Sequence, residues 1–118
     1  MGKLYNNFTE AEIQFELGNR LLEKGYSVYF ERNFDLPFYK KTKRKNKVSQ
    51  LRADIVVAHN HNVVCLIEVK NHLSEGSTDT RQHYKYESLG IPFFFCWNED
   101  YMEEALEFCL KVFNPKQV

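Results

Sequence analysis

Residues 52–70 read RADIVVAHNHNVVCLIEVK, and this stretch decides the fold because it describes a hairpin of two apolar strands. Residues 53–58 and 63–69 are rich in β-branched and aliphatic side chains, and the turn-forming residues 59–62 separate them. The second strand is apolar almost throughout, which is typical of a strand that is covered on both faces. The stretch therefore predicts the central hairpin of an α/β domain.

Three charged residues interrupt this hairpin at its open end: Asp54, Glu68 and Lys70. Glu68 and Lys70 share a face because side chains alternate along a strand. A three-residue turn would place Asp54 opposite Glu68, whereas a two-residue turn would place it opposite Ile67, pointing the other way unless a bulge intervenes. Charges are costly at the end of an apolar run unless they have a use. We therefore predict a functional site here, and the alternative is a polar hairpin end with an ordinary salt bridge.

The chemistry of these three residues points to a divalent metal. Two close carboxylates repel each other unless a cation joins them. Mg²⁺ prefers one or two carboxylates together with waters, and the main-chain carbonyl of Val69 is a candidate for a further oxygen ligand. A bound metal lowers the pKa of a ligand water and shields the charge of a phosphate. Lys70 is expected to orient the attacking water or to stabilise the charge that develops on the phosphorane.

The rest of the sequence predicts helices and strands around the hairpin, in the order α–β–β–β–α–β–α. This order describes an α/β domain with a mixed sheet flanked by helices, and its crossover should be parallel and right-handed. Residues 1–118 fit a single domain. The predicted elements are a helix over 9–24, strands over 27–32, 53–58 and 63–69, a helix from Ser77 or Thr78 to Leu89, a buried strand over 91–97, and a last helix capped by Asn98.

Two apolar lines run along the first predicted helix, so we expect it to be buried on two sides. Thr9 and Glu12 form a capping box at its start, and Gly25 ends it. Gly18 lies inside the helix at a cost of about 1 kcal/mol against alanine, which predicts close approach of another element. One apolar line consists of Ile13, Leu17 and Leu21, and the second consists of Phe8, Ala11, Phe15 and Leu22.

Glu10 is the best candidate in this helix for a supporting role at the metal. On a helical wheel Glu10 projects from the apolar line, where a carboxylate is costly unless it is used. Glu12 lies off that line and already has a role as the capping partner of Thr9. We therefore expect Glu10 to hold a metal-bound water.

The hairpin with its three charged residues resembles the PD-(D/E)xK nuclease superfamily. Asp54 stands in the first motif and thirteen residues separate it from Glu68-Val69-Lys70, which matches the second. Ala53 replaces the frequent proline of the first motif, at a position that varies in the superfamily. The αβββαβ order resembles the restriction-endonuclease-like core, and residues 82–86 (QHYKY) resemble its Gln-xxx-Tyr feature.

The most similar members are small ones: virus-type replication-repair nuclease modules, Holliday-junction resolvases and the nuclease domains of type I restriction subunits. The resemblance implies a requirement for Mg²⁺ or Mn²⁺ and a DNA substrate. Gln82 is a candidate to touch the phosphate or the attacking water, and the alternative is an ordinary exposed helix residue. Tyr84 and Tyr86 are expected to pack in the core.

The net charge is zero, but the charges are unevenly placed. Residues 99–107 contain five acidic residues and no basic one, whereas residues 40–52 contain seven basic residues and no acidic one. A flexible basic stretch is sufficient for contacts with DNA phosphates, and the alternative is a solvated loop. The predicted DNA-binding residues are Lys40, Lys41, Lys43, Arg44, Lys45, Lys47 and Arg52.

Other sequence features set limits on the function. No apolar run is long enough for a membrane span, and no signal-peptide pattern opens the chain, so a cytoplasmic protein is expected. No glycine-rich phosphate loop is present, and therefore no nucleotide cofactor is expected. Cys65, Cys96 and Cys109 lie among apolar residues and are expected to be buried and reduced.

Three functions fit these observations. The first is a metal-dependent nuclease, and retention of all three charged residues favours it. The second is a nucleic-acid-binding module with an inactive or partner-dependent nuclease site. The third is an interaction domain that uses its acidic last helix as the contact surface. For a nuclease of 118 residues, specificity is expected to come from a homodimer, from DNA shape or from a partner.

Overall fold

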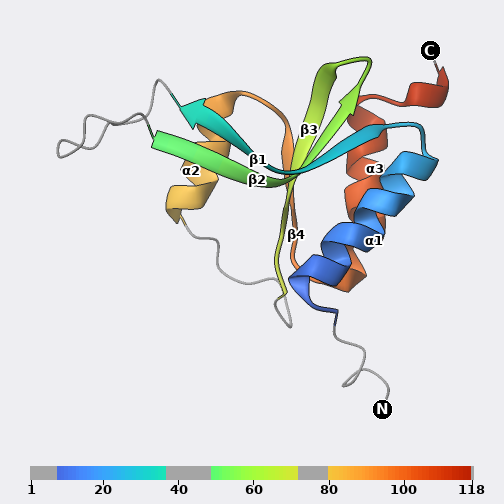
Figure 1. Ribbon diagram of the computed structural model, residues 1–118, viewed down its shortest axis with the longest axis horizontal. Coiled ribbons are helices and arrows are strands. Elements are labelled where there is room, and N and C mark those ends of the chain that lie inside the picture. The colour runs from blue at the N-terminus through green and yellow to red at the C-terminus, as the bar shows by residue number, and fades with distance from the viewer. Residues whose placement is uncertain (1–7, 37–48, 72–79, 118) are drawn as a thin grey trace.

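The computed structural model describes residues 8–36, 49–71 and 80–117, which form a four-stranded mixed sheet with helices on both faces (Figure 1). The strand order is β1-β2-β3-β4, with antiparallel pairing up to β3 and parallel pairing of β3 with β4. The predicted order of elements is confirmed. The elements are α1 (Glu10–Glu23), β1 (Ser27–Leu36), β2 (Ser49–His59), β3 (Asn62–Val69), α2 (Thr80–Leu89), β4 (Phe93–Cys96), η2 (Glu99–Tyr101), α3 (Met102–Val112) and η3 (Pro115–Gln117).

The hairpin between β2 and β3 closes through a tight turn at Asn60 and His61. Both residues have positive φ angles, 50° and 68°, and the flanking residues His59 and Asn62 pair with each other. Two central residues in the left-handed region are the signature of a type I′ turn, whose twist matches that of the strands it joins. The turn is therefore the two-residue one of the two alternatives.

A bulge in the hairpin then places the carboxylates of Asp54 and Glu68 opposite each other on neighbouring strands. The register shifts after Val57, and beyond this shift Ile55 pairs with Ile67. Continuing that register by one residue places Asp54 opposite Glu68. With the two-residue turn alone, Asp54 would lie on the opposite face from Glu68. A bulge inserts one extra residue into one strand and so returns Asp54 to the face of Glu68.

The central strands separate two hydrophobic clusters. Neighbouring residues on β2 and β3 belong to different clusters: Ile55 and Ile67 to the larger, Val56 and Leu66 to the smaller. Because side chains alternate along a strand, the clusters lie on opposite faces of the sheet. The larger cluster packs against α1 and α3, and the smaller surrounds Tyr86 of α2. The site residues are thus held between two packed layers.

In the two-stranded ribbon of β1 and β2, the regular alternation of side chains between the two faces is interrupted at Glu31, which has a φ of 54°. The pair Phe30–Ile55 lies on one side of this point and the pair Arg32–Ala53 on the other. Ile55 belongs to the larger cluster, whereas Ala53 belongs to the smaller one. A regular strand would place these two side chains on the same face. The ribbon therefore turns here, and its far end packs over α2.

The start and end of α1 agree with the prediction. The Thr9 side chain accepts the Glu12 N–H at 3.1 Å, and the Glu12 carboxylate accepts the Thr9 N–H at 2.8 Å. Gly25 follows the helix with a φ of 103°, a conformation that only glycine adopts without strain.

The prediction that α1 is buried on two sides is wrong. Its first apolar line is buried, but Ala11, Phe15 and Leu22 on the second are exposed, with Phe15 62% accessible. The helix packs by one face only, so the other face meets solvent. Gly18 does mark a close approach: a Cβ there would lie 2.7 Å from the Phe30 ring.

The last strand is shorter and less buried than predicted. We expected a buried strand over 91–97, whereas β4 spans Phe93–Cys96 and its three phenylalanines are only partly buried. β4 lies at the edge of the sheet in the described part of the chain, so one side of it has no neighbouring strand. Asn98 caps η2, which leads directly into α3.

The three cysteines are buried and free, as predicted. Cys65 of β3 and Cys109 of α3 meet inside the larger cluster with their sulfurs 3.3 Å apart. This contact, and after it burial, raise the pKa of the Cys109 thiol far above its ordinary value. Among the described helices, none is long and apolar enough to cross a membrane.

The conformation of the turn at Asn60 and His61 can be tested by substitution. We expect His61→Gly to raise the free energy of unfolding by about 0.5–1 kcal/mol, because glycine adopts the left-handed conformation without a Cβ clash. His59→Gly is the matched control and should be destabilising, since His59 lies in β2 and its ring packs 4.9 Å from that of Phe113. Urea unfolding measures both, and equal destabilisation by the two changes would contradict the type I′ assignment.

Candidate active site

The candidate site lies where β2 and β3 diverge (Figure 1). The ladder between the two strands ends on this side at the pair Ile55–Ile67. Beyond it the Asp54 carboxylate accepts the N–H of Val69 through Oδ2 at 2.8 Å. A side chain thus replaces the backbone partner that β3 loses when β2 turns away. The same bond directs the carboxylate of Asp54 toward β3.

Glu68 and Lys70 occupy the β3 side of this fork. The Glu68 side chain is only 9% exposed, and its Oε1 accepts the hydroxyl of Tyr86 at 2.5 Å. The Lys70 ammonium lies 3.5 Å from Glu68 Oε2 and donates to Gln82 Oε1 at 2.9 Å. A continuous polar chain therefore runs from Tyr86 through Glu68 and Lys70 to Gln82.

The two carboxylates are electrostatically unfavourable where they stand. Burial raises the pKa of Glu68 to about 7, and the nearby charge of Asp54 adds to the rise, while Tyr86 and Lys70 oppose it. Burial likewise raises the pKa of Asp54, against the Val69 N–H, which lowers it. A buried pair of this kind is relieved by a proton or by a cation.

Helix α2 supplies the second layer of the site. Gln82 and Tyr86 are four residues apart and so lie on the same face of the helix. The Tyr86 ring is fully buried and stacks on Phe93, with 5.2 Å between the ring centroids. Packing of the ring thus fixes the position of the hydroxyl that bonds to Glu68.

Tyr86 is the site residue that the sequence analysis missed. We expected Tyr84 and Tyr86 to pack in the core. Tyr84 is exposed, whereas Tyr86 is buried there, and its hydroxyl also reaches Glu68. The signal was present in the spacing Gln-xxx-Tyr, because a buried tyrosine needs a partner for its hydroxyl. Gln82 was a candidate for contact with phosphate or water, and the structure places it on Lys70.

The donor set fits one hard divalent cation. Asp54 accepts from Val69 through Oδ2 and Glu68 accepts from Tyr86 through Oε1, while Glu68 Oε2 lies 3.5 Å from the Lys70 ammonium. A cation held by Asp54 Oδ1 and Glu68 Oε2 would therefore share the second oxygen with Lys70. Mg²⁺ is commonly held by one or two carboxylates, with waters completing its shell. Among the described residues, no group of three or more His, Cys, Asp or Glu side chains is placed to hold a metal. The Val69 carbonyl remains the predicted further ligand.

Glu10 is not connected to the carboxylate pair in the described structure. It is the first residue of α1, its side chain is exposed, and neither a hydrogen bond nor an ion pair joins it to Asp54 or Glu68. The start of α1 does lie at the same end of the molecule as the end of β3 (Figure 1). Because Glu10 is exposed, burial does not single it out from Glu12, and its role stays a prediction.

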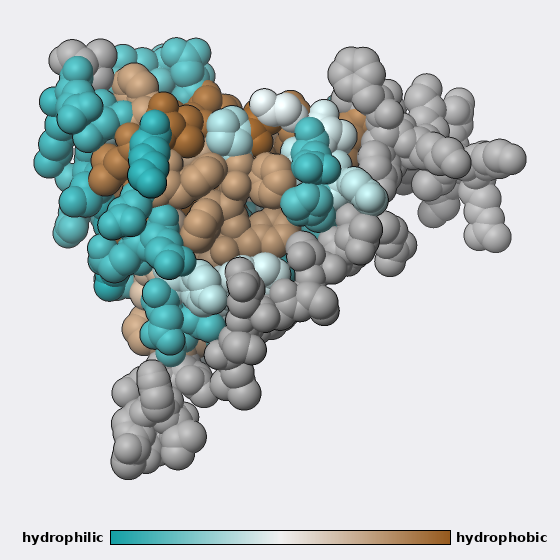
Figure 2. All heavy atoms as spheres, turned by 180° about the vertical axis from the view of Figure 1, so that it is seen from behind, coloured by the Kyte–Doolittle hydropathy of each residue, from teal (hydrophilic) through white to brown (hydrophobic). Residues whose placement is uncertain are grey.

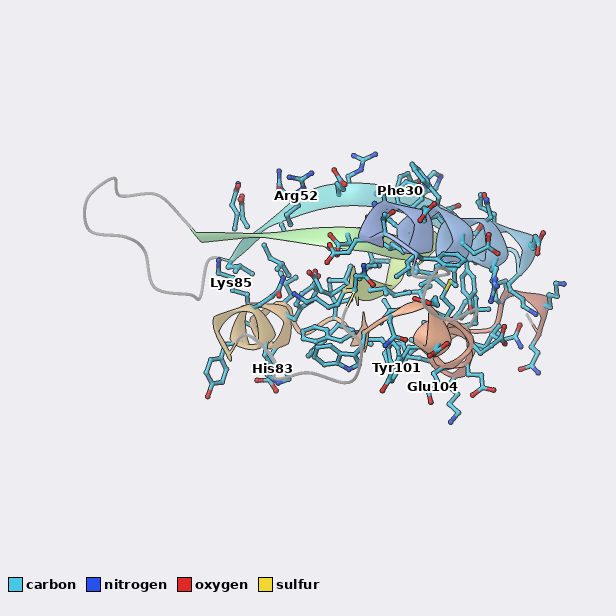
Figure 3. All side chains as sticks on the ribbon, turned by 90° about the horizontal axis from the view of Figure 1, so that it is seen from below. Phe30, Arg52, His83, Lys85, Tyr101 and Glu104 are labelled. Atoms are coloured by element: carbon cyan, nitrogen blue, oxygen red, sulfur yellow. The ribbon has the colours of Figure 1, made fainter. Side chains whose placement is uncertain are left out.

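Of the predicted DNA-binding residues, only Arg52 falls within the described residues. Its side chain is exposed and forms an ion pair with Glu31. Figure 3 shows Arg52 on the outer side of the β1–β2 ribbon and Lys85 between the ribbon and α2, where Lys85 donates to the Gln50 carbonyl at 3.4 Å. The other predicted contacts lie outside the described residues: Lys40, Lys41, Lys43, Arg44, Lys45 and Lys47.

Comparison with protein-family models, with curated proteins and with solved structures finds no match for this chain. The family resemblance therefore stays a prediction that rests on the residues of the hairpin and of α2.

The raised pKa of Glu68 predicts how stability depends on pH. The folded value of about 7 exceeds the ordinary 4.5, so the protonated form is favoured in the fold. This contribution is fully present below about 4.5 and is lost as the pH rises through about 7, a change of about 3 kcal/mol. Urea unfolding in EDTA should show stability falling across this range. Glu68→Gln should remove most of the fall and should be the more stable protein at pH 8.

Glu107→Gln provides the matched control, because Glu107 is exposed on α3. It should leave the pH profile unchanged. If Glu68→Gln were instead less stable than the parent at pH 8, the assignment of Glu68 as an unfavourable buried carboxylate would be wrong.

Proposed function

We propose that this chain is a metal-dependent deoxyribonuclease that hydrolyses phosphodiester bonds. The observation that carries the proposal is the meeting of Asp54, Glu68 and Lys70 at the divergence of β2 and β3. The buried carboxylate of Glu68 and the half-buried carboxylate of Asp54, both with raised pKa values, lie there beside a lysine ammonium. An ordinary salt bridge would need one carboxylate, and the second makes the site electrostatically unfavourable unless a proton or a cation joins the pair.

Asp54 and Glu68 would hold Mg²⁺ or Mn²⁺, with the Val69 carbonyl as a further ligand. When bound, such an ion neutralises phosphate charge and makes water a better nucleophile. The hydroxyl of Tyr86 fixes the rotamer of Glu68. The Val69 N–H does the same for Asp54. Both carboxylates are therefore held in place before any ligand arrives, which reduces the cost of binding.

Lys70 is the residue that we assign to the reacting phosphate. Its ammonium is positioned by Gln82 at 2.9 Å and by Glu68 at 3.5 Å, and 21% of the side chain remains exposed. An ammonium held in this way can orient the attacking water or stabilise charge on the phosphorane. Gln82 acts through Lys70 and is a positioning residue.

DNA is the proposed substrate because of the resemblance to PD-(D/E)xK nucleases and because of the basic stretch over 40–52. The finer fold assignment, a restriction-endonuclease-like core, belongs to the same proposal. It is supported by the observed order of elements, by the mixed sheet, and by the pair of α2 residues that contact the motif on β3.

Cleavage assays on linear, circular and branched DNA with Mg²⁺, with Mn²⁺ and with EDTA test the proposal. Glu68→Gln and Lys70→Ala should each reduce cleavage by at least about a hundredfold while the protein stays folded. Lys24→Ala is the matched control, because Lys24 is an exposed lysine at the end of α1. Full activity in either site variant would refute the assignment. A parent protein that binds DNA but never cuts it would indicate the binding module instead.

Glu10 and Glu12 provide a second, independent test. Glu10→Gln should lower cleavage at least about tenfold, or about 1.4 kcal/mol of barrier, with little change in melting temperature. Glu12→Gln should keep its activity and lose a little stability, because glutamine still caps Thr9 but without the charge. The two variants are to be measured side by side, and loss of activity in Glu12→Gln alone would reverse the assignment.

A further inference from the structure

The open edge of β4 forms an apolar surface that the proposed nuclease site does not use. Figure 2 shows hydrophobic residues gathered at the centre of this face, between α2 and α3. Phe93 and Phe95 pack on the α2 side and Phe94 on the α3 side, all of them partly buried. A groove of about 650 Å³ runs past the start of the strand, lined by Phe93 and by Phe108 of α3.

The backbone of β4 presents unused pairing groups along this edge. Leu66 donates to the Pro92 carbonyl at 2.9 Å, and Lys70 donates to the Cys96 carbonyl at 2.8 Å. In a parallel ladder this pattern turns the even-numbered residues of β4 toward β3. The N–H and C=O groups of Phe93 and Phe95 therefore point to the open side, where no strand pairs with them in the described part of the chain.

We infer that a second copy of this chain pairs with this edge, β4 against β4 in antiparallel orientation. The segment Phe93-Phe94-Phe95 is its own reverse, so a two-fold axis through Phe94 places phenylalanine opposite phenylalanine throughout. In this register Phe93 exchanges both backbone hydrogen bonds with Phe95 of the second copy, and Phe94 faces itself. Such an isologous contact closes on two subunits and buries both exposed edges.

Charges along α3 complement themselves under the same axis. Glu104, Phe108 and Lys111 are spaced four and three residues apart, so they lie on one face of the helix. Phe108 packs on Phe94, with the ring centroids 5.4 Å apart, and so lies near the proposed axis. An antiparallel α3 from the second copy then brings Lys111 to Glu104 twice. This complementarity favours a second copy over an unrelated peptide as the occupant.

The net charge of zero leaves no overall repulsion between two copies. Glu104 and Lys111 are both exposed, and neither takes part in an ion pair among the described residues. Their pairing in a dimer would use charges that the single chain leaves in solvent.

A charge-swap experiment on the full chain tests this interface. Light scattering after gel filtration should give twice the chain mass of 14.1 kDa. Glu104→Lys and Lys111→Glu should each weaken dimerisation by about tenfold or more, because each creates two like-charge contacts. The double variant should restore the dimer. Glu23→Lys on α1 is the control and should leave the dimer unchanged, since Glu23 is exposed on a helix away from β4.

Cysteine cross-linking tests the register. Residues that face each other in a non-hydrogen-bonded antiparallel pair have Cα atoms about 4.5 Å apart, within the range that a disulfide spans. Phe94→Cys should therefore form a covalent dimer with diamide, whereas Phe93→Cys should not, because it faces residue 95. A monomer at every concentration would overturn the inference. So would a dimer that is indifferent to both charge reversals and is not cross-linked through residue 94.

Discussion

The hydrogen bond from the Val69 N–H to the Asp54 carboxylate is the contact on which the site depends. When two paired strands diverge, backbone N–H and C=O groups lose their hydrogen-bond partners and need new ones. Here the carboxylate of Asp54, on β2, accepts the N–H of Val69 in place of a backbone carbonyl. This bond holds Asp54 beside Glu68 and lets the β1–β2 ribbon turn away over α2. Because the ribbon turns, its residues pack against the ring of Tyr86, and the hydroxyl of Tyr86 then holds Glu68 from the α2 side.

The two carboxylates lower the free energy of unfolding when they are charged, and the apolar packing around the site offsets this loss. Both carboxylates have raised pKa values because the surrounding layers exclude water from them. The clusters on the two faces of the sheet supply the apolar burial that makes such a site tolerable. Residues held in unfavourable states by a rigid surrounding are typical of functional sites rather than of structural ones.

The order of elements and the charged trio were predictable, because hydrophobic periodicity and charges in an apolar strand are local signals. The register was not, since the turn sequence is compatible with two loop lengths and only the bulge after Val57 decides the face of Asp54. Burial of Phe15 was predicted wrongly because a helical wheel shows which residues share a face, not how many faces are covered. The contact of Tyr86 with Glu68 was missed because a sequence pattern indicates burial but not the polar group opposite.

The bulge after Val57 also restricts how this hairpin can evolve. Turn length and bulge together determine the face on which the first carboxylate stands, so neither can change alone without removing Asp54 from Glu68. An insertion of one residue in the turn that shifted the register would also exchange the faces on which Ile55 and Val56 lie, so the two hydrophobic clusters would be disturbed together with the site. It would persist in a lineage only if the bulge were lost at the same time. Insertions and deletions in the two places should therefore be found paired among descendants of this sequence.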